Sequence, residues 1–208
     1  MGTHDRQEKD SAKEKTNYKK IALQTGLFLV LENGLRLTEE KTRRELSGKF
    51  FRDWFKSAGS LDGWSDGGKF FTNWIAHPAG GSTSAFIFAQ NHPQSRNATF
   101  GRNKDYVHAK GKQFLFALAY SELFELGPIS ESSIGNVGLY GKKQTYIDHV
   151  ITPTLGIAWS VGEDALDHHI LRPMMQKHRI LGKVLAGLLN PTRTMANALA
   201  FKPPWYRP

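Results

Sequence analysis

The chain has 208 residues and no cysteine, which excludes disulfide bonds, thiolate nucleophiles and cysteine-based metal sites. Charged residues make up 23% and hydrophobic residues 39%, the composition of an ordinary folded protein, and the formal net charge is +9. The length and the polar start predict a mobile polar tail over residues 1–16, followed by a single helical domain over residues 17–208.

The C-terminal end of the chain is strongly basic, and no acidic residue follows Asp167. Its cations are Arg172, Lys177, Arg179, Lys183, Arg193, Lys202 and Arg207. Such a segment is attracted to phosphate on anionic lipid or on nucleic acid, and it also fits a solvated face that binds nothing. Because no nucleic-acid-binding motif is present, we predict no nucleic-acid partner.

The first part of the chain predicts three helices. Residues 18–37 place apolar side chains at helical spacing, and Thr38 can cap a second helix that continues to about Leu46. Phe50 and Trp54 belong to a short aromatic helix with a basic rim, which suits either a lipid interface or packing on the domain. The N-terminus lacks the apolar region of a secretory signal.

The stretch FFTNWIAHPAGGSTSAF predicts a helix over about residues 70–90 that packs very closely on a neighbour. Pro78 is tolerated in the first turn of a helix but kinks its interior. Small residues four positions apart, such as Gly81 and Ala85, place a smooth stripe on one face of this helix. Another backbone can approach such a stripe closely.

The second half predicts helices over about residues 106–126, 145–171 and 191–200. Gly127-Pro128 ends the first of these, and Pro153 predicts a kink in the second. No alternating strand pattern of useful length is present. We therefore predict a mainly α fold, a compact bundle of about five to six helices with long glycine-rich connections. The first two of these helices should form its centre together with the preceding glycine-rich helix.

No apolar run is long enough for a simple membrane-spanning helix, which needs about 18 residues. The best runs are short or interrupted by polar residues or proline, and they are Ile21–Leu31, Phe114–Tyr120 and Val150–Val161. Peripheral or partly embedded attachment to a membrane remains compatible with this pattern.

Acidic and imidazole side chains recur on these apolar helices, where burial is costly unless they are paired. One interpretation is a buried carboxylate–imidazole site inside the bundle, which can support acid–base chemistry. Its candidate catalytic residues are His77, Glu125, Glu163 and Asp164. Its candidate binding residues are Asn73, Glu131, Asn136 and Asp148.

Two other interpretations remain open. The Glu122–Glu125 and Asp164–His168 spacings resemble the metal motifs of helical bundles without reproducing them, so we predict no metal site and no cofactor. The same acids can instead tie helix ends to loops in a purely structural network. The chain carries no Gly-x-Ser-x-Gly, Walker or His-Glu-x-x-His motif that would favour an enzyme class.

Four segments stand out in combination: FFTNWIAHPAGGS, FELGPISESSIGN, VITPTLGIAWSVGEDALD, and LLNPTRTMANAL with its closing PPWYRP. Together they resemble a family of uncharacterised bacterial envelope proteins, some of which are related to the domain of unknown function 3943. The resemblance covers about residues 60–208. It implies an exported protein with a helical body and close small-residue contacts, and it assigns no catalytic role to any residue.

We therefore expect a non-enzymatic structural or assembly protein of the bacterial cell envelope, associated with the periplasmic side of a membrane. Its expected partner is an anionic membrane surface or a membrane protein. The alternative is a hydrolase or transferase that acts on a lipid-derived substrate through His77 and nearby carboxylates. The sequence leaves open whether the chain is an enzyme.

Overall fold

The computed structural model describes residues 14–38, 40–46, 49–64, 70–137, 139 and 144–207. The fold is mainly helical and compact, as predicted, and these ranges contain no β-strand beyond an isolated bridge between Leu61 and Gln144. Most of the predicted tail over residues 1–16 lies outside the described residues.

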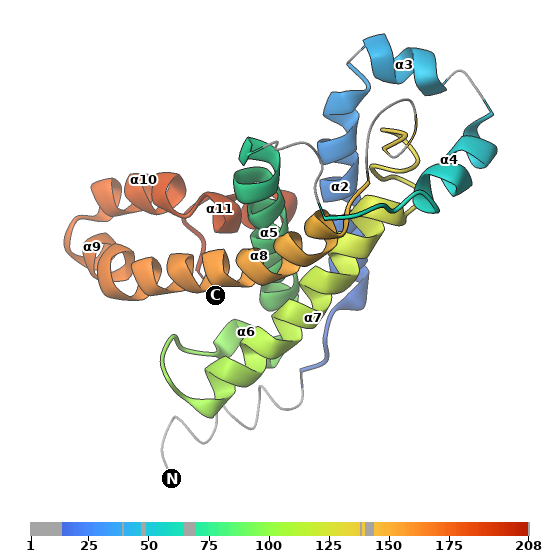
Figure 1. Cartoon of the computed structure of the whole chain (residues 1–208). Coiled ribbons are helices and arrows are strands. Elements are labelled where there is room, and N and C mark those ends of the chain that lie inside the picture. Colours follow the sequence, from blue (N-terminus) through green and yellow to red (C-terminus); the bar gives the residue numbers. More distant parts are fainter. Residues whose placement is uncertain are drawn as a thin grey trace.

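The helices follow one another closely along the chain, and Figure 1 shows their arrangement. They are α2 (Tyr18–Arg36), α3 (Glu40–Leu46), α4 (Phe50–Ala58), α5 (His77–Asn91), α6 (Pro93–Asn97), α7 (Lys104–Leu126), α8 (Tyr146–Leu166), α9 (Arg172–Lys177), α10 (Arg179–Leu189) and α11 (Pro191–Leu199). Two π-helical turns, η1 (Thr72–Ala76) and η2 (Asp167–Leu171), lead into α5 and α9. The number of helices is higher than predicted because α6, α9 and α10 were not expected.

Both π-helical turns end shortly before a proline, at Pro78 and Pro173. A proline has no N–H group, and its ring clashes with the carbonyl four residues earlier. A wider π turn accommodates that clash without ending the helix. The predicted helix over 70–90 therefore continues through Pro78, and α8 continues through η2 into α9.

The centre of the molecule is the crossing of α5, α7 and α8, as predicted. At this crossing Gly81 of α5 meets α8 backbone to backbone: a Cβ atom added to Gly81 would lie 1.9 Å from the carbonyl oxygen of Thr152. A Cβ added to Gly156 of α8 would lie 2.8 Å from the backbone of Gly81. No larger residue fits at either position, so the glycines set the distance between the two helices.

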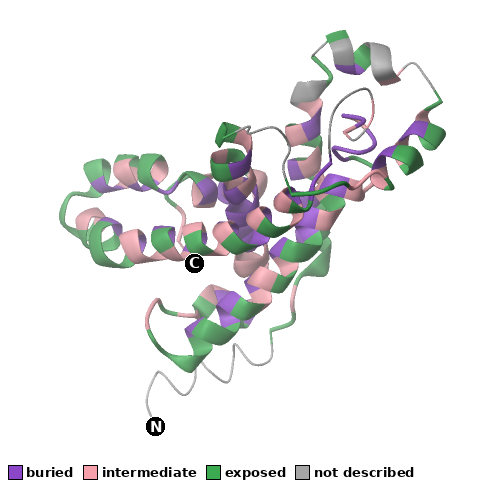
Figure 2. Ribbon diagram, viewed as in Figure 1, coloured by how far each residue is buried: buried purple, intermediate pink, exposed green. Residues whose placement is uncertain are grey.

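The interior is unusually polar, and buried residues concentrate where the three central helices cross (Figure 2). The hydrophobic core cluster is small and consists of Phe28, Phe86, Ile87, Tyr120 and Ala196. Among the described residues, buried polar side chains outnumber buried hydrophobic ones, while many large apolar side chains are exposed. The fold therefore depends on buried hydrogen bonds and ion pairs to an unusual degree.

Candidate functional site

His77 lies where the three central helices meet. It is the first residue of α5, and only 10% of its side chain is exposed. Its Nε2 lies 3.4 Å from Asp148 Oδ1 on α8, and its Nδ1 lies 3.9 Å from Glu125 Oε1 on α7. The contact with Glu125 is longer than a hydrogen bond. The imidazole therefore lies between two carboxylates, one from each neighbouring helix.

Thr152 fixes the orientation of this imidazole. Its hydroxyl donates to the backbone carbonyl of Asp148 at 2.8 Å, and the same oxygen lies 3.3 Å from His77 Nδ1. Because a hydroxyl has one hydrogen to donate, it accepts from His77, and Nδ1 carries the proton. The ring of Phe124 packs edge-on against the imidazole, with 5.8 Å between the ring centres.

A second acid, Glu32, lies partly buried beside this group and was not found in the sequence. Its carboxylate accepts a short hydrogen bond from the hydroxyl of Tyr120, and a Cβ on Gly80 would lie 3.2 Å from it. Burial raises the pKa of Glu32 to about 8, and the nearby Glu131 adds to that rise, although the Tyr120 hydrogen bond opposes it. Helical spacing could have pointed to Glu32 in the sequence, because it lies four residues after the buried Phe28 and so on the same face of α2.

The serine-rich connection after α7 closes over the same region. Its backbone folds back on the last turn of α7, where the amides of Glu131 and Ser132 donate to the carbonyls of Phe124 and Glu125. Glu131 and Asn136 are both buried, and Asn136 adopts a positive φ of 46°, which asparagine tolerates better than most residues. Asn73 is buried on η1, one turn before His77.

Glu163 lies near the other end of α8, eleven residues after Thr152, which is about 16 Å along a helix. Its carboxylate accepts from the backbone amides of Thr192 and Arg193, each at 3.0 Å, and from the Thr192 hydroxyl at 2.8 Å. These are the first amides of α11, so Glu163 caps a helix that belongs to a distant part of the sequence.

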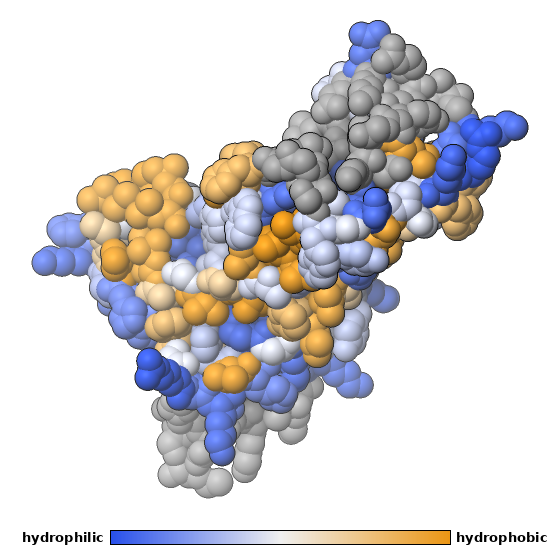
Figure 3. Space-filling model, viewed as in Figure 1, coloured by the Kyte–Doolittle hydropathy of each residue, from blue (hydrophilic) through white to orange (hydrophobic). Residues whose placement is uncertain are grey.

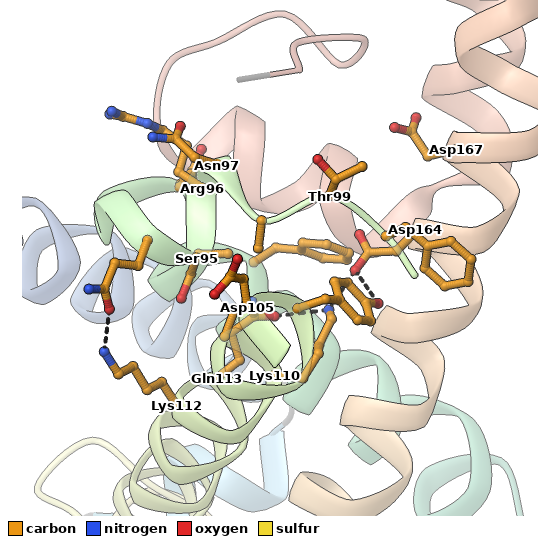
Figure 4. A pocket seen from close by; sticks show the side chains of 18 of the residues that line it. Ser95, Arg96, Asn97, Thr99, Asp105, Lys110, Lys112, Gln113, Asp164 and Asp167 are labelled. Atoms are coloured by element: carbon orange, nitrogen blue, oxygen red, sulfur yellow. Dashed lines mark hydrogen bonds and ion pairs between the residues drawn. The ribbon is translucent and has the colours of Figure 1, made fainter. Parts of the chain in front are cut away.

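Asp164 lies next to Glu163 and forms a compact ionic cluster with α7 and α11. Lys110 Nζ lies 2.7 Å from Asp164 Oδ2, the Tyr106 hydroxyl donates to the same oxygen at 2.8 Å, and the guanidinium of Arg193 binds the other oxygen. Lys110 also donates to Gln113 at 2.9 Å (Figure 4). Burial raises the pKa of Tyr106, and the charge of Asp164 raises it further, so its hydroxyl keeps its proton.

A cavity of about 1040 Å³ opens beside this cluster, between α6, α7, α8 and α11. Lys110, Asp164 and Asp167 lie in its wall (Figure 4). Arg193 lines it as well. Asp167 accepts from Arg172 at 2.8 Å and from Arg207. Burial alone would raise the pKa of Asp167, but these two arginines outweigh it and lower the pKa.

The structure divides the predicted catalytic residues between two places. His77 and Glu125 come together, and Asp148, predicted as a binding residue, joins them. Glu163 and Asp164 lie at the other end of α8 in the capping and ionic groups. Lys110 and Tyr106 were not found in the sequence, and Arg193 was noted there only as one of the basic C-terminal residues, because each becomes a partner of Asp164 only through the packing of α7 and α11.

Around His77, the Thr152 hydroxyl, the imidazole and the Asp148 carboxylate follow one another, as the nucleophile, the base and the acid do in a catalytic triad. However, Thr152 is 1% exposed, and its hydroxyl proton is donated to the backbone. No group of three or more histidine, aspartate or glutamate side chains in the described part of the chain is placed to hold a metal ion. The geometry is that of a buried hydrogen-bond network.

No family model, no curated protein and no solved structure matches this chain.

Proposed function

We propose that this chain is a non-enzymatic structural or assembly protein of the bacterial cell envelope that attaches peripherally to an anionic membrane surface on its periplasmic side. The observation that carries the proposal is the exposed apolar face of α10, which lies within an acid-free, basic part of the chain. The polar interior supports the structural part of the proposal, because its acids hold helices together.

The apolar face of α10 points away from the protein. Gly182 lies on the inner side, where an added Cβ would be 2.5 Å from the backbone of Met175 on α9. On the outer side Ile180, Val184 and Leu188 follow at intervals of four residues, with 81%, 52% and 68% of each residue exposed. Figure 3 shows hydrophobic atoms gathered over this helix. We call α9 and α10 together the arm.

The charge around this face is positive. Lys177, Arg179, Lys183 and Lys202 take part in no ion pair among the described residues, and no acidic residue follows Asp167. Lys183 lies 5.3 Å from the centre of the Trp205 ring and Lys202 lies 4.0 Å from that of Tyr206. Each cation near an anionic bilayer contributes about 1 kcal/mol of attraction.

An apolar stripe bordered by cations and aromatic rings is the pattern of a helix that lies in a membrane interface. Charge complementarity therefore favours an anionic lipid surface as the partner of the arm. In the part of the chain that the structure describes, no helix is both long and apolar enough to cross a bilayer.

The alternative, a hydrolase or transferase that acts on a lipid-derived substrate, has a specific observation in its favour: a buried imidazole that contacts a hydroxyl and two carboxylates. The burial of Thr152 and the cap formed by Glu163 favour the structural interpretation instead.

Flotation with lipid vesicles tests the proposal. The protein should float with vesicles that contain phosphatidylglycerol and remain behind with neutral phosphatidylcholine vesicles, and binding should weaken as salt shortens the Debye length from about 10 Å at 0.1 M to 3 Å at 1 M. Val184→Glu on α10 should abolish flotation, because it places a charge in the apolar face.

Val107→Glu is the matched control, since Val107 is 64% exposed on the first turns of α7 and lies outside the arm. This variant should float like the unmodified protein. Equal flotation on neutral and anionic vesicles would contradict the proposed mechanism. Equal loss of flotation in Val184→Glu and Val107→Glu would contradict it as well.

A further inference from the structure

We infer that the cavity beside Asp164 binds a phosphate group, carried either by a free phosphate ion or by the ester of a small polar headgroup. The inference goes beyond membrane attachment, because the cavity and the apolar face of α10 are different surfaces with different chemistry. It is argued from the charge balance of the cavity wall, from the burial of its cations and from the placement of Arg193.

The charges along the cavity do not balance. At the mouth, Arg96 pairs with Glu14. The other cations that line it are Lys110, Lys112, Arg172 and Arg193, and the other carboxylates are Asp105, Asp164 and Asp167. Arg207 contacts Asp167 as well and the charge of Glu163 acts on Lys110, so five cations face four carboxylates. The next acid along α8, Glu163, is already bound to the first amides of α11.

The surplus is concentrated around two carboxylates that each hold two cations. Asp164 pairs with Lys110 and Arg193, and Asp167 pairs with Arg172 and Arg207. The side chains of Lys110, Arg193 and Arg207 are only 9%, 12% and 8% exposed, so water screens them weakly. Each of these two carboxylates carries one negative charge against two cations, and an anion in the cavity would offset the remaining positive charge.

The pKa shifts of these cations agree with the geometry. Burial lowers the pKa of Lys110, an effect that Asp164 and Glu163 oppose and Arg193 increases. Burial also lowers the pKa of Arg207, and the neighbouring Arg193 lowers it further. Both groups are therefore less stable as cations than they would be in water, and a bound oxyanion would stabilise them.

Arg193 is prepared for an oxyanion. Its guanidinium lies on the ring of Phe86, 4.2 Å from the ring centre, and this contact fixes its plane. One terminal amino group of the guanidinium binds Asp164. The Nε atom is buried and has no hydrogen-bond partner among the described residues, so a phosphate would reach Arg193 through its other terminal N–H groups. An arginine held in this way can bind phosphate through a second N–H group.

The cavity volume of about 1040 Å³ is far larger than a phosphate ion. Amide side chains line the remaining wall, including Gln90, Gln94 and Gln113. Amides both donate and accept hydrogen bonds, so this wall suits a polar group attached to the phosphate.

Titration in vesicle-free buffer tests the inference. Inorganic phosphate and glycerol 3-phosphate are added at constant ionic strength, while calorimetry measures binding and thermal unfolding measures stabilisation. Both readouts should saturate with at least one of the two probes, whereas sodium chloride should have no saturable effect. Tighter binding of glycerol 3-phosphate would identify an ester as the ligand, and equal or tighter binding of inorganic phosphate would identify the free ion.

Two variants and a control locate the site. Arg172→Gln should keep the fold, because Asp167 retains Arg207, and it should weaken phosphate binding about fivefold. Lys110→Gln should weaken it about tenfold or more, since Lys110 is buried in the wall. Lys56→Gln, an exposed substitution on α4, should bind phosphate like the unmodified protein.

The inference is overturned if neither probe gives a saturable signal, or if chloride gives the same signal. It is also overturned if Arg172→Gln binds phosphate as tightly as Lys56→Gln. Membrane attachment is tested separately, because Lys110→Gln should still float with anionic vesicles and Val184→Glu should still bind phosphate. Failure of one proposal is therefore distinguishable from failure of the other.

Discussion

The two ends of α8 hold buried acids in different ways. Near its start, Asp148 and Glu125 face the single imidazole of His77, and Glu32 lies next to them against the hydroxyl of Tyr120. Near its end, Asp164 is held by two cations, and Glu163 by the amides of α11. The first group includes a carboxyl group, Glu32, whose pKa is raised, whereas the acids of the second are held by ion pairs and by backbone amides.

The largest expected difference between the two ends is a pH dependence that belongs to the start of α8. A carboxyl group whose pKa rises from 4.5 to about 8 on folding contributes its full stability below pH 4.5. That contribution declines as the pH rises from 4.5 to 8 and then levels off. The free energy of unfolding should fall by about 4 kcal/mol across this window because of Glu32.

Urea unfolding at a series of pH values measures this fall. Glu32→Gln should remove most of it, because an amide keeps the contact with Tyr120 and does not ionise. Glu40→Gln, an exposed substitution on α3, should leave the pH dependence unchanged. A pH profile that is the same with and without Glu32 would show that this end is not governed by protonation.

The next effect is steric and concerns the helix crossing beside His77. Gly81→Ala places a methyl group 1.9 Å from the Thr152 carbonyl oxygen, so α5 and α8 must separate. We expect a loss of about 3 kcal/mol in the free energy of unfolding. Gly162→Ala, in open space near the other end of α8, should instead add about 0.5 to 1 kcal/mol.

A third variant tests the cap at the end of α8. Glu163→Gln replaces a carboxylate oxygen with an amide group that faces the N–H donors of Thr192 and Arg193. The expected loss is about 2 kcal/mol in urea unfolding. Glu122→Gln, on a half-exposed side chain of α7, should cost less than about 0.5 kcal/mol. A loss in Glu163→Gln no larger than that in Glu122→Gln would contradict the role of Glu163 as the cap of α11.

Local patterns in the sequence were sufficient to predict the start of α8 and its neighbours. The small residues after Pro78 predicted a close helix contact, and Gly81 makes that contact with Gly156. Acids on apolar helices have to be paired in the interior, so the sequence was sufficient to predict that His77 and Glu125 lie close together. These inferences need only helical periodicity and the cost of burying a charge.

The end of α8 was not predictable in the same way. Glu163 finds its partners 29 and 30 residues later, at the start of α11, and only the folded chain brings them together. The intervening α10 was missed, because its two glycines lower helix propensity and no side chain caps its first turn. Glu32 and Tyr120 are 88 residues apart, so no local pattern links them.

The smallest expected effect decides between the structural and the catalytic interpretation of His77. If the imidazole only holds helices together, His77→Ala and Glu125→Gln should each lower the free energy of unfolding by about 1–2 kcal/mol. In a double-mutant cycle the two losses should couple by more than about 0.5 kcal/mol, because the side chains act on each other. His169→Ala, at an exposed position of η2, is the control and should cost almost nothing.

An enzyme would give a different result in the same measurement. A catalytic imidazole contributes to the reaction and not to the fold, so its removal would leave unfolding unchanged. Loss of less than about 0.5 kcal/mol in His77→Ala would therefore support the hydrolase or transferase alternative. A coupled loss, together with unchanged flotation of both variants on anionic vesicles, would assign His77 and Glu125 to the helix crossing and leave membrane attachment to the arm.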